Sequence, residues 1–229
     1  MIACAVIPAY EPTTNLPRFV GSLRANGFGA VVVVDDGSRQ VPSGLFAAVA
    51  AIPGCVVLHH PENRGKGAAL KTGFRHVLEA LPACDVVVTM DADGQHVTED
   101  CRRVGEALAR ADGAACFGVR DFAWKTTPFR SWWGNRWTSL LFALFYGRWF
   151  RDTQTGLRAF RRDLLPFLAG VKGEGYAYEM AVLCHLARRG HQVEQVPIQT
   201  IYVEGNVTSH YSPLKDTLRV LGMLFLCRV

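Results

Sequence analysis

Short apolar runs rich in β-branched residues alternate with helix-like segments along the first half of the chain. The predicted strands are Ala3–Ile7, Val31–Asp35, Cys55–His59 and Asp85–Asp91, and the predicted helices are 15–26, 43–51 and 65–81. Continuously apolar strands separated by helices are typical of a mostly parallel sheet that is covered on both faces. The pattern predicts an α/β fold whose ligand site lies at the carboxyl ends of the strands.

The second half of the chain is less regular. Ala114–Val119 and Gln192–Ile198 are predicted strands, 176–189 is a predicted helix, and residues 131–150 are rich in aromatic side chains. Neither an internal repeat nor a low-complexity linker divides the 229 residues, a length that suits one large domain. We therefore expect one domain with an elaborated C-terminal half.

The composition is that of an ordinary globular protein. Hydrophobic residues make up 49% and charged residues 20%, which excludes a disordered chain. Seven cysteines are scattered without a C-x-x-C pair, so zinc-finger spacing is absent. Scattered thiols and the lack of a recognisable secretory signal predict a cytoplasmic protein. Prolines and glycines interrupt the longest uncharged stretch, 40–61, so we expect no membrane-spanning helix.

Charge is distributed unevenly between the two halves. Residues 1–115 carry 10 basic and 12 acidic side chains, a net charge of −2, whereas residues 116–229 carry 15 and 8, a net charge of +7. A basic C-terminal half indicates an anionic partner, which can be a phosphate, a nucleic acid or a membrane surface. A solvated basic face explains the same numbers equally well.

Three predicted strands end in acidic segments: Pro8-Ala9-Tyr10-Glu11, Asp35-Asp36-Gly37-Ser38 and Asp91-Ala92-Asp93-Gly94-Gln95. Acidic groups gathered at one sheet edge are costly unless a cation or a hydrogen-bonding ligand is present. Asp91 and Asp93 can face one divalent cation, Gln95 can add a third oxygen, and Mg²⁺ or Mn²⁺ suits such a site. The same aspartates are also common as turn or cap residues, an alternative that remains open.

Two further segments have functional interpretations beside structural ones. The glycines of Asn63-Arg64-Gly65-Lys66-Gly67-Ala68 open a helix at which backbone N–H groups can approach a phosphate, although a simple helix start is equally compatible. Asp152, in Asp152-Thr153-Gln154-Thr155-Gly156-Leu157-Arg158, is either a catalytic carboxylate or part of a polar loop.

Arginines lie among aromatic residues in the basic half: Arg120, Arg130, Arg136, Arg151 and Arg158. Arginine forks suit phosphates. Aromatic residues interleaved with basic ones also occur in nucleic-acid binders, but here Trp137, Leu140, Leu141, Leu144 and Phe145 recur at helical spacing. We therefore expect an amphipathic helix that lies on a membrane surface or packs as a core helix, and no nucleic-acid partner.

Taken in order, these segments resemble glycosyltransferase family 2, and within it the polyprenyl-phosphate sugar transferases such as the dolichyl-phosphate mannose and glucose synthases. The matching stretches are Val6 to Tyr10, Val33 to Ser38, Asn63 to Ala68, Met90 to His96, Gly118 to Arg120, Gly134 to Arg136 and Asp152 to Phe160. The resemblance implies a GT-A fold, which is a Rossmann-like, mostly parallel sheet flanked by helices, with an elaborated acceptor side.

The resemblance also implies roles for particular residues. Pro8, Tyr10, Glu11, Asp36, Lys66, Asp91, Ala92 and Asp93 are assigned to the donor, Asp91, Asp93 and Gln95 to the metal, and Asp152, Arg120 and Arg130 to catalysis. Glu11 stands one position earlier than the family's glutamate, and Gly134 replaces a family serine. Asp152 is expected to position or stabilise charge before acting as a base, since a lipid phosphate is already ionised.

The implied activity is that of a metal-dependent inverting transferase. It moves a sugar from a UDP- or GDP-sugar to a polyprenyl or dolichyl phosphate, with Mg²⁺ or Mn²⁺, at the cytoplasmic membrane face. The implied domain covers 1–212, with a nucleotide-sugar-binding half (1–112) and an acceptor-binding half (113–212), and 213–229 is an apolar tail associated with the membrane. Alternatives are a family 2 transferase acting on a glycan or protein hydroxyl, and a non-catalytic nucleotide-sugar-binding domain.

Overall fold

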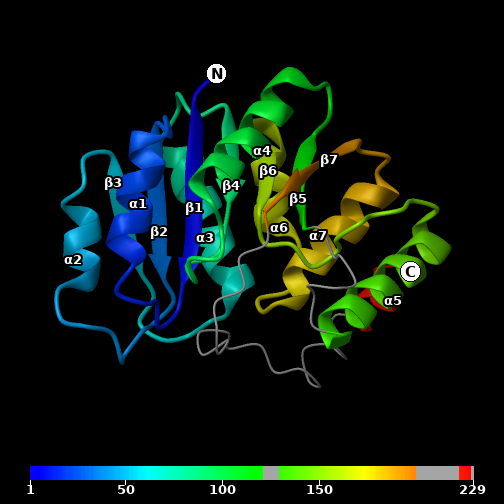
Figure 1. Ribbon diagram of the computed structural model, residues 1–229, viewed down its shortest axis with the longest axis horizontal. Helices are drawn as coiled ribbons and strands as arrows, with labels where there is room; N and C mark the ends of the chain where they lie inside the picture. Colours follow the sequence, from blue (N-terminus) through cyan, green and yellow to red (C-terminus); the bar gives the residue numbers. More distant parts are fainter. Residues whose placement is uncertain (121–128, 200–221, 228–229) are drawn as a thin grey trace.

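The computed structural model describes residues 1–120, 129–199 and 222–227, with the backbone alone for 129–132. Its centre is a seven-stranded sheet in the order β3-β2-β1-β4-β6-β5-β7 (Figure 1). The strands are β1 Ala3–Ala9, β2 Ala30–Asp35, β3 Cys55–His59, β4 Val86–Thr89, β5 Ala115–Arg120, β6 Arg158–Arg161 and β7 Val193–Ile198. The four strands predicted in the first half are all present, and both strands predicted in the second half are also formed.

All strands run in one direction except β6. It pairs antiparallel with both β4 and β5, and the remaining pairs are parallel. The carboxyl ends of the other six strands therefore meet at one edge, the lower edge of the sheet in Figure 1. The α/β prediction is confirmed. β6 was not predicted, because four residues with an arginine at each end carry no strand-like apolar pattern.

Helices cover both faces of the sheet (Figure 1). One face is covered by α1 Leu16–Ala25, α2 Leu45–Ala50 and α4 Thr98–Arg110. The other is covered by α3 Lys66–Ala80, α5 Phe129–Tyr146, α6 Leu165–Gly170 and α7 Ala177–Arg188, and a 3₁₀ turn, η1 Arg162–Leu164, precedes α6. The sequence analysis did not predict α4 or α6. The aromatic-rich stretch forms α5, and the prediction at 176–189 corresponds to α7.

Two hydrophobic cores form because successive side chains of each strand point to opposite faces. On β1, Val6 belongs to the core that contains Leu70 and Phe74 of α3, whereas its neighbour Ile7 belongs to the core that contains Val20 of α1. Both β1 side chains are fully buried. A strand that is apolar on both faces fits a central position in such a sheet, and β1 holds that position.

Gly73, in the middle of α3, lies against β1. A methyl group at this position would come within 2.4 Å of Val6 Cγ1, and a buried β-branched side chain has little freedom to move away. We expect Gly73→Ala to lower the free energy of unfolding by about 1–3 kcal/mol, measured by urea denaturation. Gly134→Ala is the control, because an added methyl group in this exposed turn of α5 meets nothing within 4 Å. Equal losses in the two variants would contradict this account.

Candidate active site

Lys66, the first residue of α3, bridges two carboxylates from different elements. Its Nζ lies 2.6 Å from Asp91 Oδ1, just beyond β4, and 2.8 Å from Glu179 Oε2 on α7. The lysine side chain is 14% exposed. The preceding residue, Gly65, has a φ of 95° and lies so close to the carbonyl of Glu174 that a Cβ would come within 2.6 Å of its oxygen. Glycine is therefore required where α3 begins.

The Lys66–Asp91 pair is charged on both sides. Burial by itself would lower the pKa of the Lys66 ammonium, but the charges of Asp91 and Glu179 outweigh it and hold this pKa above its usual range. Burial likewise works to raise the pKa of Asp91, but the Lys66 charge opposes it and the pKa of this carboxyl stays well below its usual range. Asp91 therefore remains ionised near neutral pH.

Asp93 is the second carboxylate of the predicted metal pair. Its Oδ1 accepts a hydrogen bond from the Gln95 N–H at 3.0 Å, while Ala92 between the aspartates packs against the core around α1 and α4. Burial, and then the neighbouring charge of Asp91, raises the pKa of the Asp93 carboxyl. On the other side, a Cβ at Gly156 would lie 2.3 Å from Asp91 Oδ2, so only glycine leaves room for this carboxylate.

Asp91, Asp93 and Gln95 carry the type of oxygen that a divalent cation binds together with substrate phosphates. In the part of the chain that the structure describes, no three histidine, cysteine, aspartate or glutamate side chains are placed as ligands of one metal ion. Two carboxylates and an amide oxygen are nevertheless what Mg²⁺ uses when phosphates and water complete its shell. His96 Nε2 is buried 3.7 Å from Asp91 Oδ2 and has no hydrogen-bond partner among the described residues.

Asp36 uses both carboxylate oxygens inside the protein. Oδ1 lies 2.7 Å from His60 Nδ1 and accepts the Arg64 N–H at 3.0 Å, while Oδ2 accepts the Gly65 N–H at 2.7 Å. The residue is 3% exposed. Asp36 thereby ties the end of β2 to the glycine-rich segment that opens α3, and its contact with a nucleoside stays a prediction.

The residues assigned to the donor around β1 differ in exposure. Pro8 is buried in β1 beside Val34, whereas Tyr10, after the strand, is 37% exposed. Glu11 has a φ of 48°, and its two carboxylate oxygens accept the backbone N–H groups of residues 39 and 40 at 2.7 and 2.8 Å. Glu11 thus holds the loop after β2 in place, and its donor contact remains a prediction.

Arg120 and Asp152 form a two-point ion pair. Arg120 Nε lies 2.6 Å from Asp152 Oδ2 and its Nη2 lies 3.1 Å from Oδ1, which also accepts the Gln154 N–H at 3.0 Å. Asp152 is completely buried, whereas the Arg120 side chain, at the end of β5, is 31% exposed. A buried carboxylate that contacts a guanidinium at two points fixes the orientation of the arginine side chain.

Arg158, one of the five arginines that lie among aromatic residues in the basic half, is bound within the protein. It is 2% exposed, it donates to the carbonyl oxygens of Thr155 and Glu179 at 2.8 and 2.7 Å, and its guanidinium lies 4.6 Å from the centre of the Phe117 ring. Arg158 therefore joins the loop before β6 to α7.

Glu179 and His96 were not among the predicted site residues. Glu179 is one acidic residue within a predicted helix, and no local signal shows that this turn of α7 faces Lys66. His96 directly follows the Asp91–Gln95 segment, and this position in the sequence was the one indication that it lies beside Asp91. Arg130 lies in α5, but its side chain is outside the described residues, as are Ser209-His210-Tyr211 and Lys215-Asp216.

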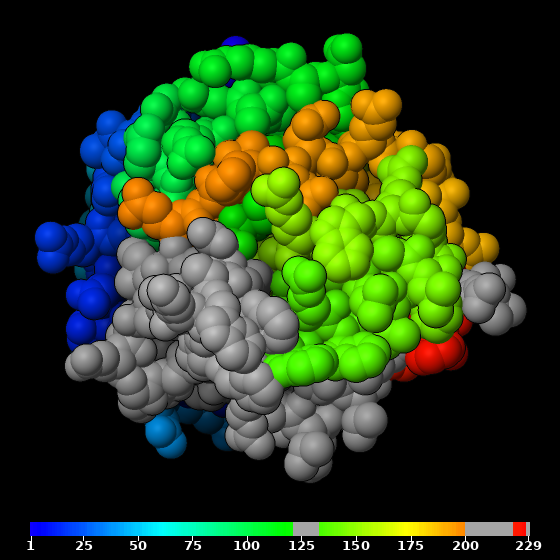
Figure 2. All heavy atoms as spheres, turned by 45° about the vertical axis from the view of Figure 1, so that its right-hand side comes forward, coloured from blue at the N-terminus to red at the C-terminus, as the bar shows by residue number. Residues whose placement is uncertain are grey.

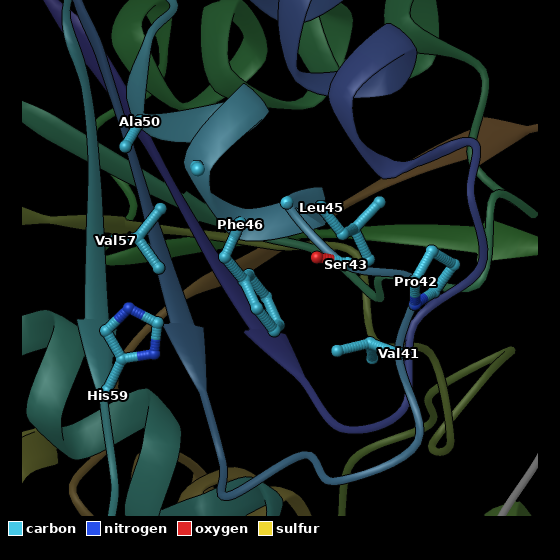
Figure 3. A pocket seen from close by; sticks show the side chains of 10 residues that line it. Val41, Pro42, Ser43, Leu45, Phe46, Ala50, Val57 and His59 are labelled. Atoms are coloured by element: carbon cyan, nitrogen blue, oxygen red, sulfur yellow. The ribbon is translucent and has the colours of Figure 1, made fainter.

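An open hollow of about 410 Å³ lies elsewhere, between α2 and the outer strand β3 (Figure 3). Apart from Ser43 and His59, its lining is apolar, and it includes Phe46 and Val57. The His59 ring packs edge-on against Phe46, with centroids 5.6 Å apart. Lys66, Asp91 and Asp93 do not line this hollow. The candidate active site is therefore the group of charged side chains around Asp91 at the carboxyl edge of the sheet.

A family model described as Glycosyl transferase family 2 matches residues 4–168. The chain belongs to this family. The matched range includes Lys66, both aspartates of the acidic pair and the Arg120–Asp152 pair. The chain is therefore a glycosyltransferase, as the resemblance implied.

Several relatives carry names that specify a lipid phosphate. An undecaprenyl-phosphate mannosyltransferase of Micrococcus luteus is 33% identical over 86% of this chain and 83% of its own length. A polyprenol monophosphomannose synthase of Mycolicibacterium smegmatis is 34% identical, with 84% and 75% covered. A UDP-N-acetylglucosamine–dolichyl-phosphate N-acetylglucosaminyltransferase of Methanococcus voltae is 26% identical, with 98% and 93% covered.

Solved structures of the same fold include glucosyl-3-phosphoglycerate synthase of Mycobacterium tuberculosis in complex with Mn²⁺, UDP and glucosyl-3-phosphoglycerate. That structure is 18% identical, has a TM-score of 0.72, and covers 99% of this chain and 79% of its own. The similarity confirms the GT-A fold.

Proposed function

We propose that this chain transfers a sugar from a UDP- or GDP-sugar to a polyprenyl or dolichyl phosphate, with a divalent cation and with inversion at the sugar carbon. The observation that carries the proposal is the arrangement at the carboxyl edge of the sheet, where the Asp91–Asp93 pair, the start of α3 and the Arg120–Asp152 pair all lie. The names of the relatives support a lipid phosphate as acceptor.

The donor diphosphate is assigned to the start of α3, beside the acidic pair. Asp91, Asp93 and Gln95 would hold the cation, which when bound neutralises the charge that builds up on the departing nucleoside diphosphate. In the first turn of α3, the N–H groups of Lys66 and Gly67 have no intrahelical partners, and the Lys66 side chain adds a positive charge beside them. The next N–H, that of Ala68, donates to the Glu174 carbonyl at 3.0 Å. Asp36 keeps this turn in place through the Gly65 N–H.

The acceptor phosphate is assigned to Arg120. Because Asp152 engages the guanidinium at two points, Arg120 is held in one orientation at the end of β5, and this orientation would keep the acceptor phosphate in line with the sugar carbon. A phosphate oxygen is already ionised at neutral pH, so the attack requires no strong base. Because the acceptor phosphate is already ionised, Asp152 can serve to position Arg120.

The helix α5 is assigned to the membrane surface, because it exposes large apolar side chains while several of its polar side chains are buried. Asn135, Thr138 and Ser139 are buried, whereas Trp137 and Leu144 are 52% and 74% exposed. Trp133, Trp137, Leu140 and Leu144 form one exposed stripe along the helix, which lies at the surface shown in yellow-green in Figure 2. An exposed apolar stripe with tryptophans suits the interface of a bilayer.

The described part of the predicted tail, residues 222–227, adds exposed apolar side chains beside α5. Residues 222–227 pack on α5, where Phe145 and Phe225 lie 4.9 Å apart and Tyr146 donates to the carbonyl of Leu224 at 3.0 Å. Phe225 and Leu226 are 56% and 73% exposed. Most of 213–229 lies outside the described residues. No described helix is both long and apolar enough to cross a bilayer. The exposed apolar side chains of α5 and of residues 225–226 support peripheral attachment at the cytoplasmic membrane face.

Vesicle binding tests this surface. We expect the double variant Trp137→Glu, Leu144→Glu to reduce partition into anionic lipid vesicles by about tenfold or more, since each side chain loses burial worth about 1.5–3 kcal/mol. Cosedimentation measures the partition. Ile2→Glu, which places the same charge on an exposed apolar residue before β1, is the control and should bind as the parent does. Unchanged binding of the double variant would exclude α5 as the membrane contact.

Donor turnover tests the activity itself. Purified protein is incubated with Mn²⁺, a panel of UDP- and GDP-sugars, and a short polyprenyl phosphate, and release of nucleoside diphosphate is followed. We expect release with one donor and only after the lipid is added. Release with a glycan or protein hydroxyl acceptor instead would move the assignment to that class, and binding without turnover for every acceptor would indicate a non-catalytic domain.

A further inference from the structure

Lys66 forms an ion pair with Asp91, a carboxylate that the proposed function gives to the cation. Lys66 Nζ lies 2.6 Å from Asp91 Oδ1, and 86% of the lysine side chain is buried. A magnesium ion approaches a carboxylate oxygen to about 2.1 Å. An ammonium and a divalent cation at such distances from one carboxylate would repel each other strongly in a partly buried site. Lys66 and the cation therefore compete for Asp91.

Glu179 offers Lys66 a second position. Its Oε2 already accepts the ammonium at 2.8 Å, while its Oε1 is buried and has no hydrogen-bond partner in the described part of the chain. An ammonium that leaves Asp91 can therefore stay in contact with Glu179. It can then direct its remaining hydrogens toward a phosphate at the start of α3, since Lys66 is itself the first residue of that helix.

We propose that Lys66 holds the cation's place at Asp91 until a nucleoside diphosphate draws it away, so that cation and donor bind together, and that Glu179 retains the displaced lysine. The inference rests on the proposed function, in which Asp91 and Asp93 bind the cation. It adds an order of events. The protein alone binds the cation weakly, and the nucleotide strengthens cation binding by drawing Lys66 away from Asp91. The two ligands then increase each other's affinity by the same factor.

Manganese binding without turnover tests the inference. Free Mn²⁺ is measured by electron paramagnetic resonance with the protein alone and with saturating UDP or GDP, whichever binds. We expect Lys66→Met to bind Mn²⁺ alone about tenfold or more tightly than the parent, and the additional gain from the nucleotide to fall by a similar factor. Glu179→Gln should change the affinity in the opposite direction, since the displaced lysine then loses its alternative partner.

Two variants control for charge and for folding. Lys71→Met removes a lysine from the same helix. Its Nζ donates to the Gly173 carbonyl at 2.7 Å and forms no ion pair with Asp91 or Asp93 in the described part of the chain, so the variant should leave Mn²⁺ affinity close to that of the parent. Lys66→Arg keeps the positive charge and should keep the weak binding of Mn²⁺ alone. Thermal unfolding of each variant shows whether it is folded.

The outcomes separate the inference from the function on which it rests. If Lys66→Met is folded and binds Mn²⁺ alone no better than the parent, while nucleotide and Mn²⁺ still bind together, the inference is wrong and the proposed metal site stands. Equal tightening in Lys71→Met would likewise overturn it, because a general charge effect would then explain the gain. If no variant binds Mn²⁺ even with nucleotide, both the metal site and the inference are wrong.

Discussion

Replacement of Asp93 by asparagine should reduce sugar transfer by about a thousandfold or more while leaving the protein folded. The cation that we assign to Asp91 and Asp93 would stabilise the leaving diphosphate by several kcal/mol, and each 1.4 kcal/mol corresponds to about a tenfold change in rate. Asparagine retains the oxygen that accepts the Gln95 N–H, so the turn should persist. Donor-dependent turnover at saturating Mn²⁺ measures the loss.

The same substitution should not destabilise the metal-free protein. Burial and the charge of Asp91 raise the pKa of Asp93 in the folded protein. Asp93 therefore lowers the free energy of unfolding as the pH rises through the ordinary carboxyl range, where this side chain becomes ionised. Asp93→Asn should therefore match or exceed the parent's melting temperature without metal, and should lose the increase in melting temperature that Mn²⁺ with nucleotide produces. Asp112→Asn, on the surface, is the control. A retained Mn²⁺-induced shift would exclude Asp93 as a ligand.

Replacement of Asp152 by asparagine should lower kcat by about 10²–10³-fold and change the donor dissociation constant by less than about threefold. The side chain keeps its shape but loses the charge that holds Arg120 at two points. Arg120, at 31% exposure, can then turn toward solvent and no longer present one orientation to the acceptor. Steady-state kinetics and donor titration give the two numbers separately.

A double-mutant cycle distinguishes positioning from proton transfer. If Asp152 acts through Arg120, the combination of Asp152→Asn with Arg120→Lys should lose little more than either single variant, because lysine cannot reproduce the two-point contact. If Asp152 removes a proton, the losses should multiply. Equal losses of turnover and donor affinity in Asp152→Asn would reject a role in the chemical step and leave a structural one.

Local patterns were sufficient for the strands of the first half and for the acidic pair. The run from Val31 to Val34 is apolar on both faces, so it can be satisfied only between two cores, and helices must supply them. Asp91 follows a similar run, and parallel strands place such residues at one edge. These inferences need only periodicity and chain direction, because both are properties of neighbouring residues.

Local patterns were insufficient where a contact joins distant segments. The strand β6 forms because β4 and β5 offer free edges on either side of Arg158–Arg161, and the exposed stripe of α5 follows from the burial of Asn135, which donates to the Arg151 carbonyl at 2.7 Å. Neither the free edges beside β6 nor the burial of Asn135 can be predicted from the residues of β6 or α5 alone. The hydrogen bonds by which Asp36 holds the glycine-rich segment likewise join distant residues, and its contact with a nucleoside stays a prediction.

The sequence by itself determined the fold class, the family and the edge of the sheet at which acidic residues gather, since these depend on the order and periodicity of side chains. The tertiary structure decided that Lys66 lies between Asp91 and Glu179 and that Asp152 holds Arg120. Lys66 and Glu179 are 113 positions apart, and only the packing of α3 against α7 brings their charges together. In a partly buried site, that proximity governs which groups remain charged and what they can bind.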